Sequence, residues 1–586
     1  MVYTAPKLIE LLQKQHQQRG NTDLFKQGTF ILQWRSKVGS HPHPDLETMI
    51  PASEPCGSWK PTQQPQNPED ISLLRPEAKR NVAQNNKYFY NLPYRGYIPA
   101  SSIRGLVRAW ASKRPDIKPE MERLLGKQEN DTINAGKFIF FDAYPQQETK
   151  VTLDIVNPQQ DFQVYHQGQS TPLSFYTLGD GENNITVKVA IKGIEGKVTP
   201  DDVAKVWSWI EQALNAYGVG SRTASGYGAI KTQGNSPTIE SDPRCTTKTF
   251  TFSLYSQGCG GVTVQDIQLR PSHWRGWLRS WLLRFLLGVM SQENAQKTLG
   301  ELMGSIDGND NNAQKGAVRL EMVKGRIWGD RSEDQPRFYT WKGQLKITAP
   351  TNILNKIILP IIKFATSVGG VGRGWRRPLH IFTMPNGREA SRGCHLILNH
   401  KVKDKNTQEQ KTKLFGLSPN QPQTWQTTYD NWLNSVREIW GNQVRVGVNN
   451  NLQGEVFSPQ TCAIYVVPYP DEEPLDRQNN TWGDFQYVTD SRGKGMDLIY
   501  KTEPRYKRNP EVGGSAAGGG NSHCSWVSIK RVNVTHPSIE DSECQEVVCV
   551  FMGGVAVNHP NHLRARFVRD LNNINGNRHL FGVQPH

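Results

Sequence analysis

One segment of the sequence occurs twice, and this duplication constrains the fold more than any other feature. The stretch "PASSIRGLVRAW" (Pro99 to Trp110) aligns without a gap with "RPSHWRGWLRSW" (Arg270 to Trp281). After each copy, the same features recur in order: a leucine-rich helix end, a glycine, a polar loop and an apolar strand. A chain of 586 residues is long enough for about two to four domains. Two copies of one domain explain the pattern best.

Each copy of the duplicated segment is expected to form a helix with a basic face. Ser101 and Ser102 can accept hydrogen bonds from the free N–H groups of a first helical turn, so the helix should start near them. Arg104 and Arg108 are four residues apart and share a face. Gly105 costs a helix about 1 kcal/mol relative to alanine, which indicates that something, such as a phosphate chain, approaches the backbone there. The alternative is an ordinary solvated helix face.

The second copy repeats these features at Ser272, Arg275 and Arg279. Tryptophans accompany both helices, three of them at helical spacing, and we expect them to fill the core. They are Trp110, Trp274, Trp277 and Trp281.

A glycine-rich loop follows a predicted apolar helix in each copy. The loops are "YGVGSRTASGYGAI", from Tyr217, and "VGGVGRGWRRPLHI", from Val368. Glycines let backbone N–H groups approach phosphates, and arginines add charge and paired donors. A helix C-cap followed by a turn is the alternative for Gly218 and Gly220. Neither loop carries a Rossmann or Walker signature, so we expect no nucleotide cofactor.

The order of predicted elements favours an α+β fold. Strand candidates at 28–34 and 248–256 precede the two helices, and strand, helix, two strands, helix, strand is the order of a ferredoxin-like unit. We therefore predict two tandem ferredoxin-like domains. The predicted ranges are 1–24 for an N-terminal helical extension, 25–238 for the first domain with a long loop at 35–97, and 244–586 for the second domain with an insertion at about 382–523.

The charge favours a polyanionic partner. The chain carries 69 Lys and Arg against 54 Asp and Glu, a net charge of +15. It has no apolar run of about 18 residues and no apolar region typical of a secretory signal, so we expect a cytoplasmic protein without a membrane partner. The eight cysteines form no C-x-x-C pair, which favours reduced, mostly structural thiols.

The helix start "IPASSIRGLVR" and the loop "GVGSRTASGYG" together resemble motifs of the CRISPR-associated RAMP superfamily. Among its members, the chain is similar to the backbone subunits of type III effector complexes, with two backbone domains fused. The resemblance implies RRM-like, modified ferredoxin-like domains that bind a guide RNA paired with target RNA. It implies other type III RAMP subunits and the large signature subunit as partners.

The resemblance also implies that both domains hold RNA by its backbone, while base pairing reads the sequence. Trp375, in a loop of arginines, is a candidate for stacking on a base or ribose. The predicted RNA-binding residues are Ser101, Ser102, Arg104, Gly105, Arg108, Gly218, Gly220, Arg222, Ser272, Arg275, Arg279, Gly370, Gly372, Arg373, Trp375, Arg376 and Arg377.

A loop aspartate is the candidate catalytic residue. In "NPEDISLLRPE", Asp70 precedes an apolar and then basic stretch, as in catalytic backbone members of the family. The resemblance implies that Asp70 assists attack of a target ribose 2′-hydroxyl on the adjacent phosphate with Mg²⁺ or a similar cation. An N-cap or exposed loop acid is the alternative. Asp45, in "HPHPD", and Asp266 are reserve candidates; "HPHPD" is otherwise an ordinary extended loop.

Two other functions remain open from the sequence. One is a structural or capping RAMP subunit without cleavage activity. The other is a metal-independent endoribonuclease that processes guide RNA with histidine.

Overall fold

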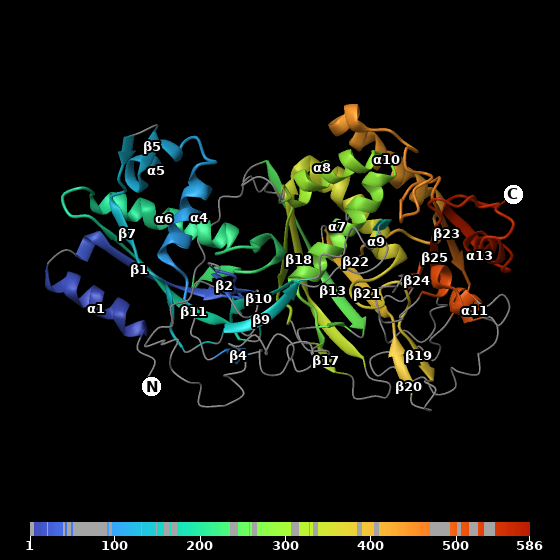
Figure 1. Ribbon diagram of the computed structural model, residues 1–586, viewed down its shortest axis with the longest axis horizontal. Coiled ribbons are helices and arrows are strands. Elements are labelled where there is room, and N and C mark those ends of the chain that lie inside the picture. Colours follow the sequence, from blue (N-terminus) through green and yellow to red (C-terminus); the bar gives the residue numbers. More distant parts are fainter. Residues whose placement is uncertain are drawn as a thin grey trace. The chain divides into compact units, whose positions relative to one another are not determined.

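A computed structural model of the 586-residue chain separates into two compact units (Figure 1). Unit 1 comprises Met1–Val156, Leu173–Asp242 and Gly261–Asp266, and unit 2 comprises Asn157–Pro172, Pro243–Gly260 and Ile267–His586. The structure describes residues 5–19, 22–38, 41–43, 48–50, 91–92, 97–129, 132–147, 149, 151–156, 164–165, 173–179, 181, 183–234, 244–256, 258–260, 267–305, 316–326, 329–331, 338–383, 389–403, 409–468, 493–500, 506–514, 525–532 and 545–585.

The main sheet of unit 1 has the order β12-β1-β11-β7, and β8 also pairs with β11. All pairs in this sheet are antiparallel. Its strands are β1 (Phe25–Leu32), β7 (Phe138–Phe140), β8 (Tyr144–Pro145), β11 (Ile185–Gly193) and β12 (Ile230–Thr232). The helices of the unit are α1 (Ala5–Gln18), α4 (Ala100–Ala111), α5 (Lys118–Leu125) and α6 (Pro200–Tyr217), with short turns η1 (Thr22–Leu24) and η4 (Thr223–Ser225).

Different helices pack on the two faces of this sheet: α4 and α6 on one face and α1 on the other. Phe30 and Val187 belong to a core that also contains Trp110 of α4 and Trp207 of α6. Strand side chains alternate between faces, so Lys188, next to Val187, lies on the opposite face. There it pairs with Glu10 of α1 at 3.2 Å. The predicted N-terminal helix therefore exists and covers the second face of the sheet.

A second sheet and a small hairpin complete unit 1. The sheet has the order β2-β3-β10-β9-β4, in which β3 and β10 are parallel. The "HPH" of "HPHPD" is the edge strand β2 of this sheet. The strands are β2 (His41–His43), β3 (Thr48–Ile50), β4 (Asn91–Leu92), β9 (Val151–Val156) and β10 (Leu173–Leu178), and β5 (Lys127–Glu129) and β6 (Thr132–Asn134) form the hairpin.

The main sheet of unit 2 has the order β16-β18-β13-β21-β22, and β17 pairs with β18. Its strands are β13 (Cys245–Ser256), β16 (Arg319–Val323), β17 (Asp330–Arg331), β18 (Tyr339–Pro350), β21 (Cys394–Lys403) and β22 (Gln410–Leu414). The helices of this part are α7 (Pro271–Leu287), α8 (Gln292–Met303), the π-helical turn η5 (Ile353–Ile358), α9 (Leu359–Val368) and α10 (Pro422–Trp440), followed by η6 (Gly441–Gln443). The short pairs are β14 (Cys259–Gly260) with β15 (Ile267–Gln268), and β19 (His380–Thr383) with β20 (Glu389–Arg392).

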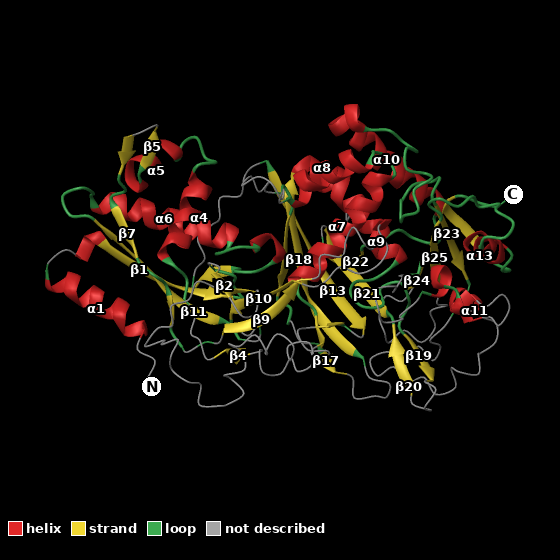
Figure 2. Cartoon of the chain, in the orientation of Figure 1, coloured by secondary structure: helices red, strands yellow, loops and turns green. Residues whose placement is uncertain are grey.

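Another antiparallel sheet lies in the C-terminal part of unit 2 (Figure 2). Its order is β24-β25-β23-β26. The elements are β23 (Cys462–Val467), α11 (Lys494–Tyr500), η9 (Tyr506–Arg508), α12 (Pro510–Gly513), β24 (Val527–Val532), β25 (Gln545–Phe551), α13 (Leu563–Asn572) and β26 (Arg578–Gly582). The chain is thus a mixed α+β protein whose sheets are mainly antiparallel.

The fourth strand of the main sheet in unit 2 lies inside the range predicted as an insertion. Residues 394–403 form β21, which pairs with β13, whereas the strands predicted to resume the domain, β24 and β25, belong to the C-terminal sheet. The sequence does not indicate this strand pairing, because β21 ends in a lysine-rich stretch and all residues of its neighbour β22 are exposed.

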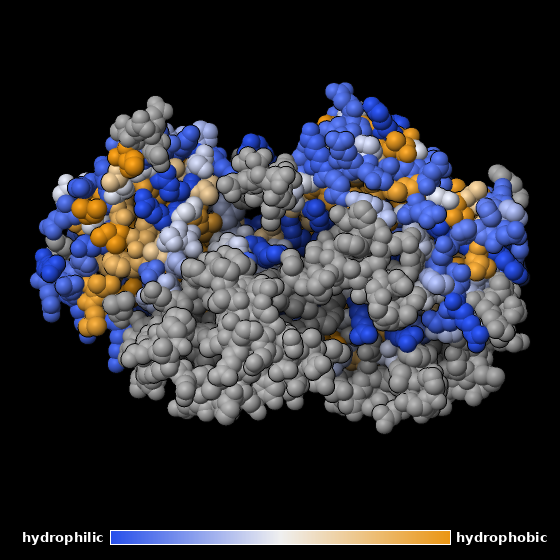
Figure 3. Space-filling model, in the orientation of Figure 1, coloured by the Kyte–Doolittle hydropathy of each residue, from blue (hydrophilic) through white to orange (hydrophobic). Residues whose placement is uncertain are grey.

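The strands and helices predicted from apolar patterns are present, and the four tryptophans are buried as expected. Large exposed hydrophobic residues occur near β5 to β7 of unit 1, where Ile133 is 74% exposed and Ile139 45% (Figure 3). Within the described residues, no helix is long and apolar enough to span a bilayer.

Candidate nucleic-acid interface

The duplicated arginines bind the end of the following helix in each unit. In unit 1, Arg104 Nη2 donates to Leu125 O at 2.8 Å, and Arg108 Nη1 donates to the same oxygen at 3.0 Å. Arg108 also donates to Gly126 O. These carbonyls end α5, where the regular backbone hydrogen bonds of the helix stop. The arginine pair therefore caps a helix C-terminus, where positive charge is favourable.

Unit 2 repeats this arrangement with equivalent atoms. Arg275 donates to Met303 O, and Arg279 Nη1 donates to Gly304 O at 3.1 Å, at the end of α8. Burial, followed by the neighbouring Arg279, lowers the pKa of Arg275 to about 10, so it stays charged at neutral pH. The duplicated arginines thus cap a helix C-terminus in both units, a structural role that differs from the ordinary solvated helix face considered from the sequence.

The duplicated serines lie inside the first helical turn and do not cap it. The helix α4 starts near Ser101 and Ser102 as predicted, but its N-cap residue is Pro99. The N–H of Ala100 instead donates to Asp142 Oδ1 at 2.7 Å. Ser272 has the equivalent place in α7, whose N-cap residue is Arg270. Capping fails because each helix begins two or three residues earlier than the serines would require.

Gly105 lies on an exposed part of α4. A Cβ atom built at Gly105 would meet no atom of the described residues within 4 Å. Packing among the described residues therefore does not explain why position 105 is a glycine. Close approach of an external partner to the helix backbone would explain it. Arg104, beside it, is exposed as well.

The glycine loop of unit 1 folds against the segment that follows β1. Ser221 N donates to Lys37 O at 2.7 Å, and Gly228 N donates to Arg35 O at 2.8 Å. Gly220 has a φ of 85°, and a Cβ there would lie 2.3 Å from Lys37 O. This position therefore requires glycine. Gly218 is the C-cap residue of α6, as the alternative reading predicted.

The loop of unit 2 has the same backbone course. Gly372 has a φ of 86°, and Arg373 N donates to Gly258 O at 3.1 Å, which matches the bond from Ser221 to Lys37. Arg222 and Gly374 follow at the same spacing, and both have left-handed backbone, with φ of 59° and 75°.

Positive charge gathers at the exposed side of the first loop. Gly220 and Ser221 are exposed, and Arg222 is partly exposed. Burial, followed by the nearby Arg222 guanidinium, lowers the pKa of Lys37. Two cations thus lie beside exposed backbone, a combination that suits a phosphate. Lys37 was not among the residues predicted from the sequence, although it lies just after a strand and near the basic residue Arg35.

A buried pair anchors this loop to the second sheet of unit 1. Asp154 of β9 is fully buried; its Oδ1 lies 3.2 Å from Arg35 Nη1, and its Oδ2 accepts from Tyr227 OH at 2.5 Å. Trp34 packs on the Tyr227 ring at 4.4 Å between centroids. The loop is therefore held in a defined position.

Three residues of the second loop make contacts inside unit 2. Arg376 is 6% exposed and ion-paired with Glu455, which also accepts from Arg284 Nε at 2.7 Å. Arg377 donates to Val512 O at 2.8 Å. Trp375 is partly buried against Trp281 at 5.9 Å between centroids. Burial and the ion pair with Glu455 argue against the RNA contact predicted for Arg376, whereas Trp375 and Arg377 are partly exposed, and their predicted RNA contacts stay predictions. Arg373 is exposed.

The candidate catalytic residues lie outside the described residues: Asp70, Asp45 and Asp266. In the part of the chain that the structure describes, no three His, Cys, Asp or Glu side chains are grouped to hold a metal ion. The expected divalent cation therefore stays a prediction that depends on residues outside the described part of the chain.

Residues 77–231 match the RAMP superfamily. Cmr6 from Pyrococcus furiosus is a similar solved structure, 18% identical, with 35% of this chain and 97% of that chain covered and a TM-score of 0.17. Cmr1 from the same organism, in its apo form, is 10% identical, with 57% and 99% covered and a TM-score of 0.31. A chain of the type III-B Cmr-beta complex bound to cognate target RNA and AMPPnP is 11% identical, with 55% and 98% covered and a TM-score of 0.24. No curated protein matches the chain.

Proposed function

We propose that this chain, which carries a RAMP-superfamily region at residues 77–231, is an RNA-binding backbone subunit of a type III CRISPR ribonucleoprotein. One observation carries the proposal: both units hold a glycine loop with the same backbone course against the segment after their first strand. The loop of unit 1 exposes backbone beside Lys37 and Arg222, and the loop of unit 2 exposes Arg373. Contacts of this type recognise phosphate and not base sequence.

In this proposal the two units are tandem ferredoxin-like domains. If the strands of each main sheet other than β8, β17 and β22 are counted in chain order, β12-β1-β11-β7 reads 4-1-3-2. The sheet of unit 2, read from β21 through β13 and β18 to β16, has the same order. The helices α4 and α6, and α7 and α9, occupy the two helical positions of a βαββαβ unit.

The proposed ligands are a guide RNA and its duplex with target RNA, and the proposed partners are other type III subunits in the cytoplasm. The net charge of +15 favours a polyanion, and Gly105 offers a second place for close approach on α4. The full chain should bind single-stranded RNA with an affinity that falls steeply as salt concentration rises. Binding that is independent of salt would contradict the proposal.

Target cleavage through Asp70, with a divalent cation, is the catalytic part of the proposal, and it is supported by the sequence resemblance. We derive no step through the cation. The test is target cleavage by the reconstituted guide-loaded complex carrying Asp70→Ala, with Mg²⁺ and with EDTA, while RNA binding is measured in parallel. We expect loss of one cleavage position with binding retained. Asp116→Ala, an exposed aspartate between α4 and α5, is the matched control. Unchanged cleavage would leave either an RNA-binding structural subunit, the second candidate function, or cleavage through the reserve candidates Asp45 or Asp266, whose alanine variants separate the two.

A further inference from the structure

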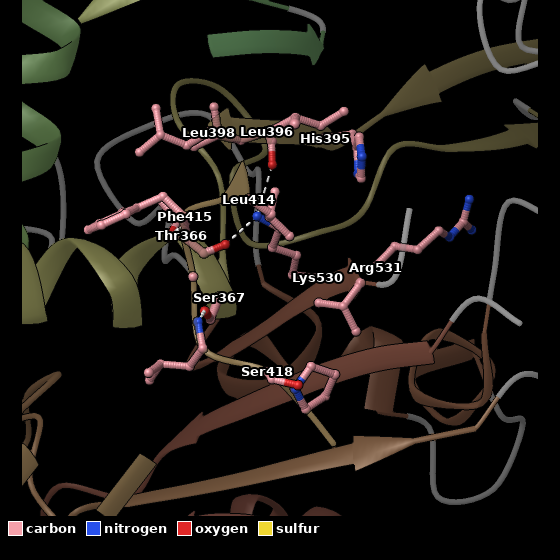
Figure 4. Close-up of a pocket in the computed structure, with 15 residues that line it drawn as sticks. Thr366, Ser367, His395, Leu396, Leu398, Leu414, Phe415, Ser418, Lys530 and Arg531 are labelled. Atoms are coloured by element: carbon pink, nitrogen blue, oxygen red, sulfur yellow. Dashed lines mark hydrogen bonds between the residues drawn. The ribbon is translucent and has the colours of Figure 1, made fainter. Parts of the chain in front are cut away.

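Unit 2 contains a cavity of about 220 Å³ (Figure 4). It is lined by the end of α9, by β21, by the residues that end and follow β22, and by β24. Much of the wall is apolar, including Leu396, Leu414, Leu417 and Val532. Hydroxyl groups of Ser367 and Ser418 add polar positions to it.

Apart from these serines and Thr366, the polar side chains of the cavity are basic. His395, Lys530 and Arg531 line it, and none of the fifteen described lining residues is Asp or Glu. The amine of Lys530 donates to Leu396 O at 2.9 Å and to Thr366 O. These neutral carbonyl acceptors hold the amine without neutralising its charge.

One carboxylate faces this basic group from a neighbouring strand, and it is already engaged. Glu546 of β25 is directly opposite Arg531 of β24. Its two oxygens accept from Gly493 N at 2.7 Å and from Met496 N at 2.9 Å. Arg531 is only 7% exposed, and within the described residues its Nη2 has no hydrogen-bond partner.

Burial and two neighbouring cations keep the His395 ring of the cavity uncharged at neutral pH. Burial, followed by Lys530 and Arg531, lowers the pKa of His395 to about 3. Burial lowers the pKa of Lys530 to about 8, with Cys394 acting in the opposite direction. Lys530 is held by neutral carbonyl oxygens, and a bound anion would offset the cost of burying its charge.

The positive charge continues along the β21–β22 hairpin. Lys401 and Lys403 of β21, and Lys411 and Lys413 of β22, are all exposed. On the same hairpin, burial and then Lys248, Lys363 and Lys413 lower the pKa of His400. Leu414, which ends β22, lines the cavity, so the hairpin leads directly into it.

We propose that this cavity binds a phosphate group carried by single-stranded RNA, whose neighbouring phosphates run along the β21–β22 hairpin. The inference rests on the proposed RNA-binding function and assigns a further binding site within unit 2. The volume suits one phosphate with its sugar and excludes a duplex, and the apolar walls suit the sugar and base next to a phosphate. The phosphate is either internal to the strand or at its end.

The test measures binding of a 12-nucleotide oligouridine, with and without a 5′-phosphate, to the full chain. We expect Arg531→Gln to weaken binding at least fivefold. We expect Lys411→Gln with Lys413→Gln to weaken binding and to reduce the slope of log affinity against log salt by about 0.7 for each phosphate that the lysines no longer neutralise. The control is Lys297→Gln, an exposed residue of α8, with less than twofold effect. RNA should also protect Lys530 from acetylation, which reports on the cavity itself.

The two RNA forms distinguish the sources of the phosphate. Tighter binding of the 5′-phosphorylated form assigns the cavity to a strand end, and equal binding assigns it to an internal phosphate; both support the proposal when Lys530 is protected. Lys411 and Lys413 are exposed, so replacing them should not affect folding. These two substitutions therefore test the proposal even if Arg531→Gln fails to fold.

Three results would overturn the inference. If Arg222→Gln weakens RNA binding while the cavity and hairpin variants do not, the proposed function stands and this site fails. If the wild-type chain does not bind RNA, both fail together. If polyglutamate protects Lys530 and RNA does not, the cavity is a site for an acidic protein segment.

Discussion

Arg279 donates a hydrogen bond to the carbonyl oxygen of Gly304 at 3.1 Å, and Arg108 makes the equivalent bond to Gly126 in the other unit. The arginines of the duplicated motif therefore link two consecutive helices in each unit, because they bind the carbonyls at the end of the second helix. This does not exclude RNA contact, because Arg104 and Gly105 are exposed on the same helix.

Replacing Arg108 with alanine should destabilise unit 1 by about 1 to 2 kcal/mol, because the carbonyls that end α5 lose a charged donor. Thermal unfolding gives the stability, and amide exchange in residues 118–125 gives the location. Lys113→Ala, an exposed neighbour, is the control. Unchanged exchange in α5 would show that the carbonyls do not depend on Arg108.

Gly105→Ala should stabilise the fold while it weakens RNA binding. The new methyl group meets no described atom within 4 Å, so helix propensity alone predicts a gain of about 1 kcal/mol. If RNA backbone approaches this position, affinity should fall about tenfold, equivalent to about 1.4 kcal/mol. Gly441→Ala, which also points into open space, is the control for both measurements. Unchanged affinity would remove Gly105 from the interface.

Gly228→Ala should destabilise unit 1 by at least about 2 kcal/mol, because strain at a φ of 68° adds to a clash 1.8 Å from Val219 O. Gly234→Ala is a matched control, since its φ is 93° but no atom of the described part of the chain lies within 4 Å of the added Cβ. The difference between the two melting temperatures isolates the clash. Similar melting temperatures would show that the loop can rearrange.

Glu455→Gln should destabilise unit 2 by about 3 to 5 kcal/mol, because it leaves Arg284 and Arg376 buried without their carboxylate. Glu438→Gln removes an exposed partner of Lys356 and should cost less than about 1 kcal/mol. Calorimetric unfolding of the two variants compares them directly. Equal effects would show that the buried cluster is balanced by other groups.

His395 should make the fold sensitive to acid. Its pKa is about 3 in the folded chain and near 6.5 when unfolded, so the unfolded state binds more protons between these values. Its contribution to stability is complete above pH 6.5 and is lost as the pH falls, by up to about 1.4 kcal/mol per pH unit. His395→Gln should flatten this part of a stability curve measured by denaturant unfolding. An unchanged slope would contradict the folded pKa.

Much of the architecture could be read from local patterns. Apolar and β-branched runs predicted the strands near 28–34 and 248–256, and the duplication predicted matching helices with buried tryptophans. These features can be predicted from the sequence because they depend on residues close together in the chain. The fourth strand of the sheet in unit 2 was not legible, because β21 pairs with a strand more than a hundred residues away.

The candidate site divides in the same way. By itself, the sequence determined that two copies of an Arg-Gly helix and a glycine loop exist, together with an excess of positive charge, because these are properties of residue identity and spacing. Only the tertiary structure decided which arginines stay at the surface. Arg376 has the same chemistry as Arg373, yet packing buries it against Glu455, while Arg373 remains exposed. Burial depends on distant segments brought together by folding, and no local pattern contains that information.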